Sequence, residues 1–463
     1  MCVTTQPNNA PQVLASARTD LSLSDITTLR IGGPISTYVE THSEDELVQV
    51  VEYADANSID ILVVGGGSNI VAADEGFDGI VVRDMRSGVN IDQVDSCGGG
   101  SVTVPAGHNW DDFVVQSIAE GWIGIESLIG IPGSVGAAPV QNIGAYGAEV
   151  ANVISSVRVY DRGTQRKRTF ALFELGFGYR DSIIKQSMTI GDDSGRVWGP
   201  TPRYVVLEVS FQFRLGTRSA PVQYAELAKR LGVNVGDRAP AKDIAQTVLE
   251  LRGGKGMLVD ASDRPELADT AGARGTLPPA LLAATSDEIV SGAAAGFITL
   301  DAEAPAESCG TDIRNEDVPS VEYTDSASFK PDFDRWSAGS FFTNPIIAAE
   351  DADGLPEGAP RYPVHSVAPL ATTGPSTGAV DAAKVKTSAA WLIQNAGFDR
   401  GFGVHGESSA ATLSTKHTLA LTNRGSASAA DVRELASAIR AGVQEKFGIL
   451  LEPEPVVVGP KIN

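Results

Sequence analysis

The sequence has few of the residues that build metal centres, disulfide scaffolds and membrane spans. Its 463 residues include 3 cysteines and 5 histidines, all scattered along the chain. A zinc ribbon, a disulfide framework or a metal cluster is therefore not expected. No apolar run approaches the ~20 residues that cross a bilayer, and residues 1–17 lack the basic residues of a signal peptide. These absences predict a cytoplasmic protein with no membrane span and no metal.

Positive charge is also scarce. The chain has 36 basic and 58 acidic residues, a net charge of -22, so repulsion from phosphate disfavours nucleic acid as a partner. A small anionic substrate remains compatible, because an acidic protein can still build a local cationic pocket. The acidic residues are unevenly distributed along the chain, because residues 258–335 include 16 acidic and 5 basic residues.

The length suggests about three domains, and the hydrophobic pattern divides the chain accordingly. Residues 1–85 read as a small α/β unit. It has strands near 35–40, 59–64 and 79–82, and a helix that begins at the capping box of Ser43 and Glu46. Residues 86–257 mix strands at 102–105 and 204–215 with a helix at 110–120. These patterns predict a mixed α and β chain.

The second half of the chain begins with an acidic stretch rich in alanine, glycine and proline. Residues 258–330 show no sustained period apart from a short helix at 278–284, so we expect a mobile surface insertion that is dispensable for turnover. Residues 331–450 form the third ordered region. Its last helix starts at the N-cap Ser428 and stops at Gly448, and residues 449–458 read as a final strand.

Two glycine-rich segments could meet a large ligand. Residues 65–69 (Gly-Gly-Gly-Ser-Asn) follow a strand directly, and glycines let backbone N–H groups converge on a phosphate. An ordinary tight turn explains this segment equally well. It is not the Rossmann fingerprint, because Ile70 replaces the third glycine. Residues 129–147 are too rich in glycine and proline for regular structure. Residues 132–134 and 136–138 can pack flat against a ring system and donate N–H groups to it, although a structural loop is the favoured interpretation of this segment alone. Two such segments in one chain make a large phosphate-bearing cofactor more plausible than either segment does alone.

Three side chains in irregular segments could carry chemistry. The guanidinium of Arg180 suits a carboxylate or an enolate, although a surface salt bridge is the simpler role. Ser340 lies between a glycine and two phenylalanines, where its hydroxyl either caps a turn or donates a proton; the nucleophile elbow of hydrolases is absent. Glu452 and Glu454 stand at strand spacing, so both carboxylates are expected on one face.

Taken in order, these segments resemble the UDP-N-acetylenolpyruvoylglucosamine reductase family, flavoenzymes of early peptidoglycan synthesis. The matches span nearly the whole chain: residues 65–69, 131–136, 141–147, 178–182, 338–345 and 451–454. The resemblance implies an α+β chain with a two-part FAD-binding fold of the vanillyl-alcohol-oxidase type and a C-terminal substrate domain. Residues 1–85, completed by a strand at 451–463, and residues 86–257 would then be the two FAD-binding subdomains. Residues 331–450 would bind substrate.

The resemblance also implies an activity and assigns residues to it. FAD and NADPH would reduce the enolpyruvyl ether of UDP-N-acetylglucosamine enolpyruvate, in a monomeric enzyme. Arg180 would hold the substrate carboxylate, Glu454 would assist there in its protonated form, and Ser340 would donate the final proton. The residues implied for substrate are Tyr179, Tyr224 (the tyrosine that closes over substrate in one subclass), Lys255 and Asn344. Those implied for FAD are Gly65, Gly66, Gly67, Ser68, Asn69, Ile131, Gly133, Ser134, Gly136, Asn142, Gly144 and Ala145.

Two positions depart from the family pattern, and two other functions compete with it. Pro455 stands where valine is usual, and Asn395 where some relatives have a glutamine that contacts the nucleotide. The competing functions are another FAD oxidoreductase with the same fold and a non-catalytic sensor of sugar nucleotides. A sensor would not need Arg180, Ser340 and Glu454 together, so the sequence favours the reductase.

Overall fold

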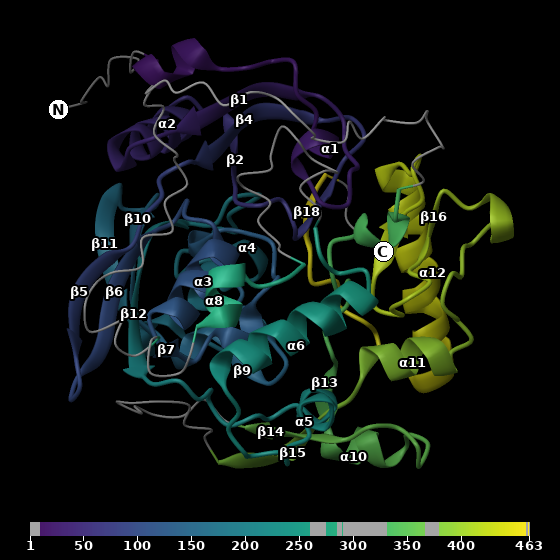
Figure 1. The fold of residues 1–463 in the computed structure, drawn as a ribbon. Coiled ribbons are helices and arrows are strands. Elements are labelled where there is room, and N and C mark those ends of the chain that lie inside the picture. The colour runs from purple at the N-terminus through teal and green to yellow at the C-terminus, as the bar shows by residue number, and fades with distance from the viewer. Residues whose placement is uncertain are drawn as a thin grey trace, which may run out of the picture.

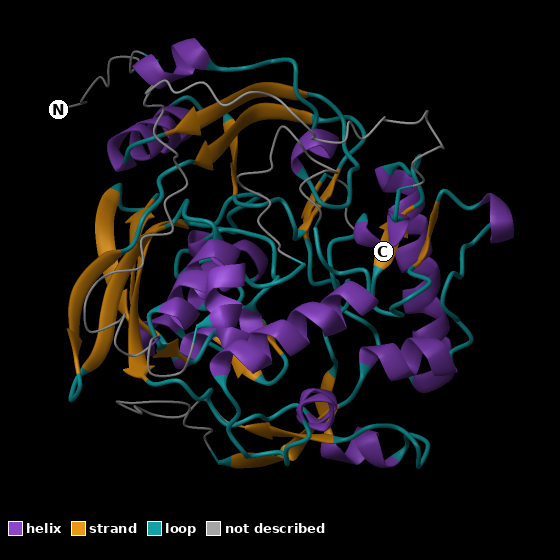
Figure 2. Cartoon of the chain, viewed as in Figure 1, coloured by secondary structure: helices purple, strands orange, loops and turns teal. Residues whose placement is uncertain are grey.

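A computed structural model describes residues 10–259, 275–284, 289, 331–365, 379–459 and 462. These residues form an α+β protein with three structured units, shown as a ribbon in Figure 1 and by secondary structure in Figure 2. No helix within these ranges is both long and apolar enough to cross a membrane.

The first unit is a parallel sheet in the order β1-β4-β2. Its elements are η1 (Gln12–Ser16), α1 (Leu23–Ile26), β1 (Ile35–Thr41), α2 (Glu44–Ala56), β2 (Asp60–Val64), β3 (Ile70–Ala72) and β4 (Phe77–Asp84). The expected capping box is confirmed, because the Ser43 side chain accepts the Glu46 N–H and the Glu46 carboxylate accepts the Ser43 N–H. Since both partners are close in sequence, the box fixes the helix start locally.

The second unit is an antiparallel sheet in the order β11-β10-β12-β6-β5, packed against helices. Its strands are β5 (Asn90–Asp95), β6 (Gly99–Pro105), β7 (Trp122–Ile123), β8 (Gly144–Ala145), β9 (Ala148–Glu149), β10 (Ile154–Asp161), β11 (Arg166–Ala171) and β12 (Tyr204–Leu215), and its helices are α3 (Trp110–Ala119), α4 (Ile183–Thr189), α5 (Ala225–Leu231) and α6 (Ala241–Gly254). The aromatic rings of Phe113, Phe211 and Phe213 lie together in its core. In Figure 1 the sheet lies at the left, with α3 beside it and α6 nearer the centre of the molecule.

The structure describes part of the acidic stretch. The predicted short helix is confirmed as α8 (Pro279–Ala283). Leu277, Leu281 and Ile289 are buried in the core of the second unit, and the Lys242 ammonium on α6 donates to the carbonyl of Ala284. These contacts anchor the described part to the second unit, although most of residues 275–284 are exposed, and the rest of 260–330 lies outside the described residues.

The third unit combines a small sheet with a helical layer. Its elements are β13 (Ile346–Ala348), α10 (Ala349–Asp353), β14 (Tyr362–His365), β15 (Val380–Lys386), α11 (Ala389–Asn395), β16 (Ala411–Leu413), β17 (Leu421–Asn423) and α12 (Ala429–Phe447). The predicted last helix is confirmed, with its capping box at Ser428 and its end at the left-handed Gly448. Figure 1 shows α11 and α12 at the right and β13–β15 at the bottom.

The expected strand at 449–458 is mostly wrong. Only β18 (Val456–Val458) is a strand, and it pairs in parallel with β3 of the first unit. Pro453 and Pro455 have no N–H to donate, so a continuous ladder cannot form before β18. Consequently Glu454 lies in a loop, and the pairing of β18 with β3 brings this loop to the edge of the first unit.

Candidate active site

A cavity of about 480 Å³ lies where the three units meet. Its wall takes residues 65–69 from the first unit, residues 131–146 in large part from the second, and Ser337–Ser340 with Glu454 from later segments. Eleven of the twelve residues implied for FAD lie on this wall, as do Arg180, Ser340 and Glu454. Segments far apart in sequence thus share one cavity.

The turn between β2 and β3 is built to receive an anion. Within the described part of the chain, the N–H groups of Gly66, Gly67 and Ser68 have no hydrogen-bond acceptor, so all three are available to a phosphate. A side chain would not fit: a Cβ on Gly66 would lie 2.8 Å from the Cα of Gly133, and one on Gly67 would lie 1.8 Å from the Ile26 carbonyl. These residues fit the phosphate-bearing cofactor that the sequence predicts.

The second glycine-rich segment contributes shape more than hydrogen bonds. The N–H groups of Gly136, Ala137 and Ala138 all bond to protein carbonyls, so the expectation that they donate to a ring is not met. Gly136 packs so closely on Ala106 that a Cβ would approach within 2.4 Å. The flat backbone surface remains available to a bound ring.

Asn142 is the one residue implied for FAD that does not lie on the cavity wall. It is buried, with a left-handed φ of 48°. Its amide donates to Glu149 at 2.8 Å and to the carbonyl of Gly178 at 2.9 Å, and it accepts the N–H of Ala151. Asn142 therefore connects residues 142–151 with each other on the side away from the cavity, and its bond to Gly178 holds the turn that precedes Arg180.

Arg180 and Glu454 form an ion pair on the cavity wall. Arg180 adopts a left-handed φ of 55°, which turns its side chain back so that Nε lies 3.1 Å from Glu454 Oε1. Its Nη2 donates to the carbonyl of Gly144. Burial raises the pKa of Glu454 above its ordinary value, although Arg180 and Lys185 act to lower it. A carboxyl with a raised pKa thus lies beside a cation that is held in place.

Glu452 does not share this environment. Its side chain is exposed and lines a neighbouring cavity, while Glu454 lines the first. The expectation that both carboxylates share one face is wrong, because residues 451–455 are not a strand and the two-residue period does not apply.

Ser340 is brought beside Glu454 by backbone pairing. The N–H of Glu454 donates to the carbonyl of Phe341 at 2.8 Å, and the N–H of Phe341 donates to the carbonyl of Leu419. Ser340 lines the cavity and is only partly buried, so its hydroxyl can meet a ligand there.

Several polar residues on the wall were not singled out from the sequence, and Gln141 and His417 are among them. Gln141 Nε2 donates to Glu454 Oε1 at 3.2 Å. His417 is mostly buried, and burial together with nearby Lys255 lowers its pKa to about 4. Gln141 stood inside a recognised motif, whereas His417 gave no signal beyond its residue type.

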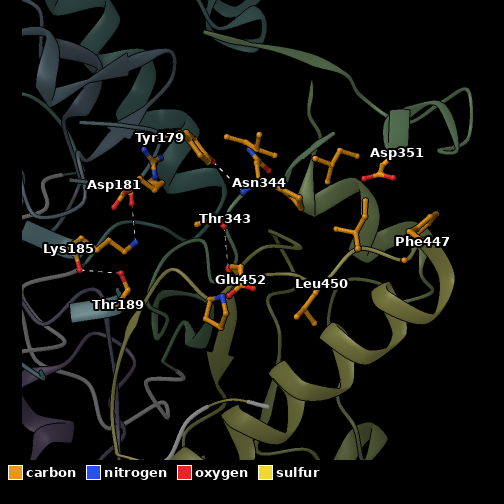
Figure 3. Close-up of a pocket in the computed structure, with 17 residues that line it drawn as sticks. Tyr179, Asp181, Lys185, Thr189, Thr343, Asn344, Asp351, Phe447, Leu450 and Glu452 are labelled. Atoms are coloured by element: carbon orange, nitrogen blue, oxygen red, sulfur yellow. Dashed lines mark hydrogen bonds between the residues drawn. The ribbon is translucent and has the colours of Figure 1, made fainter. Parts of the chain in front are cut away.

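The residues implied for substrate fall into two groups. Tyr224 and Lys255 line the first cavity, where the ring of Tyr224 meets Tyr146 edge-on at 5.5 Å and Lys255 Nζ lies 2.9 Å from Glu226. Tyr179 and Asn344 line the second cavity, of about 740 Å³, which also touches Arg180. Figure 3 shows the Tyr179 hydroxyl facing the N–H of Asn344, at 3.4 Å.

Neither family departure disturbs this arrangement. Pro455 is buried just after Glu454, next to β18. Asn395 is at the end of α11, where its amide donates to the carbonyl of Trp391, and it lines neither cavity.

Comparison with known proteins matches both halves of the molecule. Residues 35–168 match the "FAD binding domain" family, and residues 330–458 match the family described as "UDP-N-acetylenolpyruvoylglucosamine reductase, C-terminal domain". The UDP-N-acetylenolpyruvoylglucosamine reductase of Cutibacterium acnes is 40% identical over 95% of this chain and 90% of its own length. That of Nocardia farcinica is 38% identical over 97% and 91%.

A solved structure also aligns with almost the whole chain. The crystal structure of the Thermus caldophilus UDP-N-acetylenolpyruvylglucosamine reductase covers 96% of this chain and 100% of its own at 21% identity, with a TM-score of 0.49. With 40% identity to a curated relative over 95% of its length, this chain belongs to the UDP-N-acetylenolpyruvoylglucosamine reductase family.

Proposed function

We propose that this protein reduces UDP-N-acetylglucosamine enolpyruvate to UDP-N-acetylmuramate, a peptidoglycan precursor, with NADPH as reductant. The observation that carries the proposal is the convergence of Arg180, Glu454 and Ser340 on the cavity wall that also holds residues 65–69. The names of the curated relatives support the same reaction. We further propose that the enzyme is monomeric and cytoplasmic.

The cavity wall divides the work between cofactor and protein. Gly66, Gly67 and Ser68 would hold the FAD phosphates by backbone N–H groups, and residues 131–138 would pack on its ring. FAD, when bound, supplies the hydride that it has taken from NADPH. The protein must then bind the enolpyruvyl carboxylate, stabilise the charge that develops on it, and deliver a proton.

Arg180 and Glu454 would bind the substrate carboxylate. As hydride adds to the terminal carbon of the enolpyruvyl group, negative charge moves onto the carboxylate as an enolate. The Arg180 guanidinium is already held by Glu454 and by the carbonyl of Gly144, so it stabilises this charge without reorganising. The neutral form of Glu454 can donate to the same oxygen atoms, because its raised pKa reduces repulsion.

Ser340 would complete the reaction. Its hydroxyl proton passes to the central carbon of the enolate, and the bond from that carbon to hydrogen gives the lactyl ether. An alcohol is a weak acid, but the enolate is a strong base and the hydroxyl is held in place.

Four further residues would bind the nucleotide portion of the substrate. We propose that Lys255 neutralises the diphosphate and that Tyr224, half exposed beside Tyr146, closes over it. Tyr179 and Asn344, in the second cavity, would contact the remaining part of the nucleotide.

The proposal is tested by separating the two half-reactions in Ser340→Ala. Anaerobic stopped-flow spectra should show flavin bleaching by NADPH at the wild-type rate. Reoxidation by the enolpyruvyl substrate should slow by roughly 100-fold or more, because the proton donor is lost. The matched control is Ser426→Ala, an exposed serine of the same unit, which should change neither rate.

Each competing function predicts a different result. If both half-reactions survive in Ser340→Ala, the proton-donor role is wrong. A wild-type protein that bleaches with NADPH but ignores the enolpyruvyl substrate would be another FAD oxidoreductase. A colourless protein that cannot be reconstituted with FAD would be the sugar-nucleotide sensor.

A further inference from the structure

A chain of side-chain amides connects the glycine-rich turn to Glu454. Asn69 Nδ2 donates to Gln141 Oε1 at 3.1 Å, and Gln141 Nε2 donates to Glu454 Oε1 at 3.2 Å. The amide of Asn69 also lies 3.4 Å from the backbone carbonyl of Glu454. Asn69, Gln141 and Glu454 all line the first cavity, so the chain runs along the site itself.

This chain distinguishes the two oxygen atoms of Glu454. Oε1 accepts from both Arg180 Nε, at 3.1 Å, and Gln141 Nε2, at 3.2 Å. Among the described residues, none donates to Oε2. An oxygen that already accepts two N–H groups has little capacity to carry a proton, so the proton of the neutral acid belongs on Oε2.

The direction of the Gln141 amide is also fixed. Glu454 needs a donor, so Nε2 must point toward it, and this leaves Oε1 to accept from Asn69. If the amide were reversed, an acceptor would face the carboxyl and a donor would face the donor of Asn69, and both hydrogen bonds would be lost. Asn69 therefore selects the orientation that Glu454 requires.

We propose that Gln141 is a positioning residue that holds Oε1 of Glu454, so that Oε2 presents its proton to the substrate. Asn69 keeps Gln141 in that orientation. Since Asn69 belongs to the turn that would hold the FAD phosphates, cofactor and acid are positioned by one hydrogen-bonded unit. This inference rests on the acid role proposed above for Glu454.

A positioning role predicts a pH effect as well as a rate effect. Arg180, Lys185 and Gln141 face Glu454, and each favours the charged carboxylate. The Tyr179 phenol also lies near Glu454, and burial raises its pKa, so it stays uncharged. Burial opposes them and raises the pKa. Removing the Gln141 N–H removes one of the groups that favour the charged carboxylate, so the pKa of Glu454 should rise further. The acid would then stay protonated to higher pH.

The test compares Gln141→Met and Gln141→Glu with the wild type in both half-reactions. Flavin bleaching by NADPH should be unchanged. Reoxidation by the enolpyruvyl substrate should slow by roughly 10- to 100-fold, and the alkaline limb of its pH profile should move upward. The shift should be larger in Gln141→Glu, where two carboxyl groups share a proton.

The control is Gln186→Met. The Gln186 amide also donates to a carboxylate, that of Asp181 at 2.7 Å, but Gln186 lies outside both cavities. It should change neither rate nor pH profile. Bound FAD per chain, measured from the visible spectrum, should be the same in all variants and shows that each one folds; Gln141→Glu keeps the side-chain shape if Gln141→Met does not fold.

A double-mutant cycle with Glu454→Gln decides whether Gln141 acts through Glu454. If it does, adding Gln141→Met to Glu454→Gln should slow reoxidation by less than about 2-fold, because the positioned acid is already gone. Full additivity, or equal slowing of both half-reactions, would overturn the inference. If Glu454→Gln alone leaves reoxidation unchanged, the acid role fails and not merely its positioning.

Discussion

At the scale of single residues, the site depends on how closely two backbones approach each other. Gly66 and Gly133 lie so near that a methyl group at Gly66 would meet the Cα of Gly133 at 2.8 Å and its N at 2.9 Å. Neither atom can move without moving the whole segment. The free N–H groups beside Gly66 therefore keep their direction only while position 66 has no side chain.

Gly66→Ala should consequently weaken FAD binding while the protein still folds. We expect the Kd of FAD to rise by at least about 10-fold, measured by titrating the apoprotein with FAD and following flavin fluorescence. Saturating FAD at 100 times the wild-type Kd should stabilise the wild type by about 2.7 kcal/mol and Gly66→Ala by less. Gly358→Ala, in open space, is the control, and equal FAD affinity in both variants would refute the role of the close approach.

Single residues also show where the sequence stops being informative. The motifs singled out Arg180, Ser340 and Glu454, and the structure brings all three to the wall of one cavity. It could not separate Glu454 from Glu452, because that choice depends on the path of a proline-interrupted loop. Gln141 was overlooked because its partners, Asn69 and Glu454, are distant in sequence.

At the scale of secondary-structure elements, α2 connects the two sheets. Its acidic residues face basic residues of the second unit: Glu44 accepts from Arg158 and lies 2.7 Å from Lys167, and Asp55 lies 2.6 Å from Arg162. The cavity wall takes residues from both units, so these ion pairs help to fix the width of the cavity.

Glu44→Gln should destabilise the protein by about 1 to 2 kcal/mol in urea unfolding at pH 7. Burial opposes the charge of Glu44, but the hydrogen bonds from Lys167 and Arg158 outweigh it and lower its pKa. A lowered pKa stabilises the folded state above the ordinary value of 4.5, and this contribution disappears as the pH falls through the folded-state pKa. The difference between wild type and Glu44→Gln should therefore vanish in acid.

Asp45 supplies the matched control. It neighbours Glu44 and lies 3.3 Å from the same Lys167, yet its side chain is 80% exposed compared with 16% for Glu44. Asp45→Asn should change stability by no more than about 0.5 kcal/mol. If Asp45→Asn lowered the free energy of unfolding as much as Glu44→Gln, the charge at the start of the helix, and not the contact between the units, would be responsible for the loss of stability.

Elements set by local chemistry were predictable, and those set by packing were not. The helices α2 and α12 were predictable because the sequence of each contains a capping box and an apolar face. The three-residue strands β3 and β18 were not predictable in this way, because each exists only by pairing with the other. The short helix α8 was predicted, but the burial of Leu281 was not, since its surroundings come from distant segments.

At the scale of the whole molecule, the third unit is fixed to the first by specific contacts. Asn423 donates to the carbonyls of Leu29 and Arg30, Thr28 donates to the carbonyl of Ser337, and Asp74 accepts the N–H of Ala429 at the start of α12. These contacts fix the third unit beside the first, and Ser340 and the turn at 65–69 line the same cavity. The order of motifs predicted three units, but no local pattern encodes such docking.

Tyr224, from the second unit, lines the same cavity as Ser340 of the third unit. Its side chain is 40% exposed, so there is room for it to move. If it closes over the nucleotide, Tyr224→Ala should raise the KM of the enolpyruvyl substrate by roughly 10-fold, with a smaller effect on kcat. Steady-state kinetics would measure this, with the exposed Val235→Ala as control. An unchanged KM would exclude closure by this residue.

The pairing of β18 with β3 has a consequence for biosynthesis. While the chain is being translated, the edge of β3 stays unpaired, because its partner β18 is synthesised only after all three units. Until then Glu454 is missing and the turn at 65–69 has no cover from that side. Contacts so distant in sequence form late and leave partly folded chains open to aggregation. Products of premature termination should therefore be substrates for proteases rather than partly active enzymes.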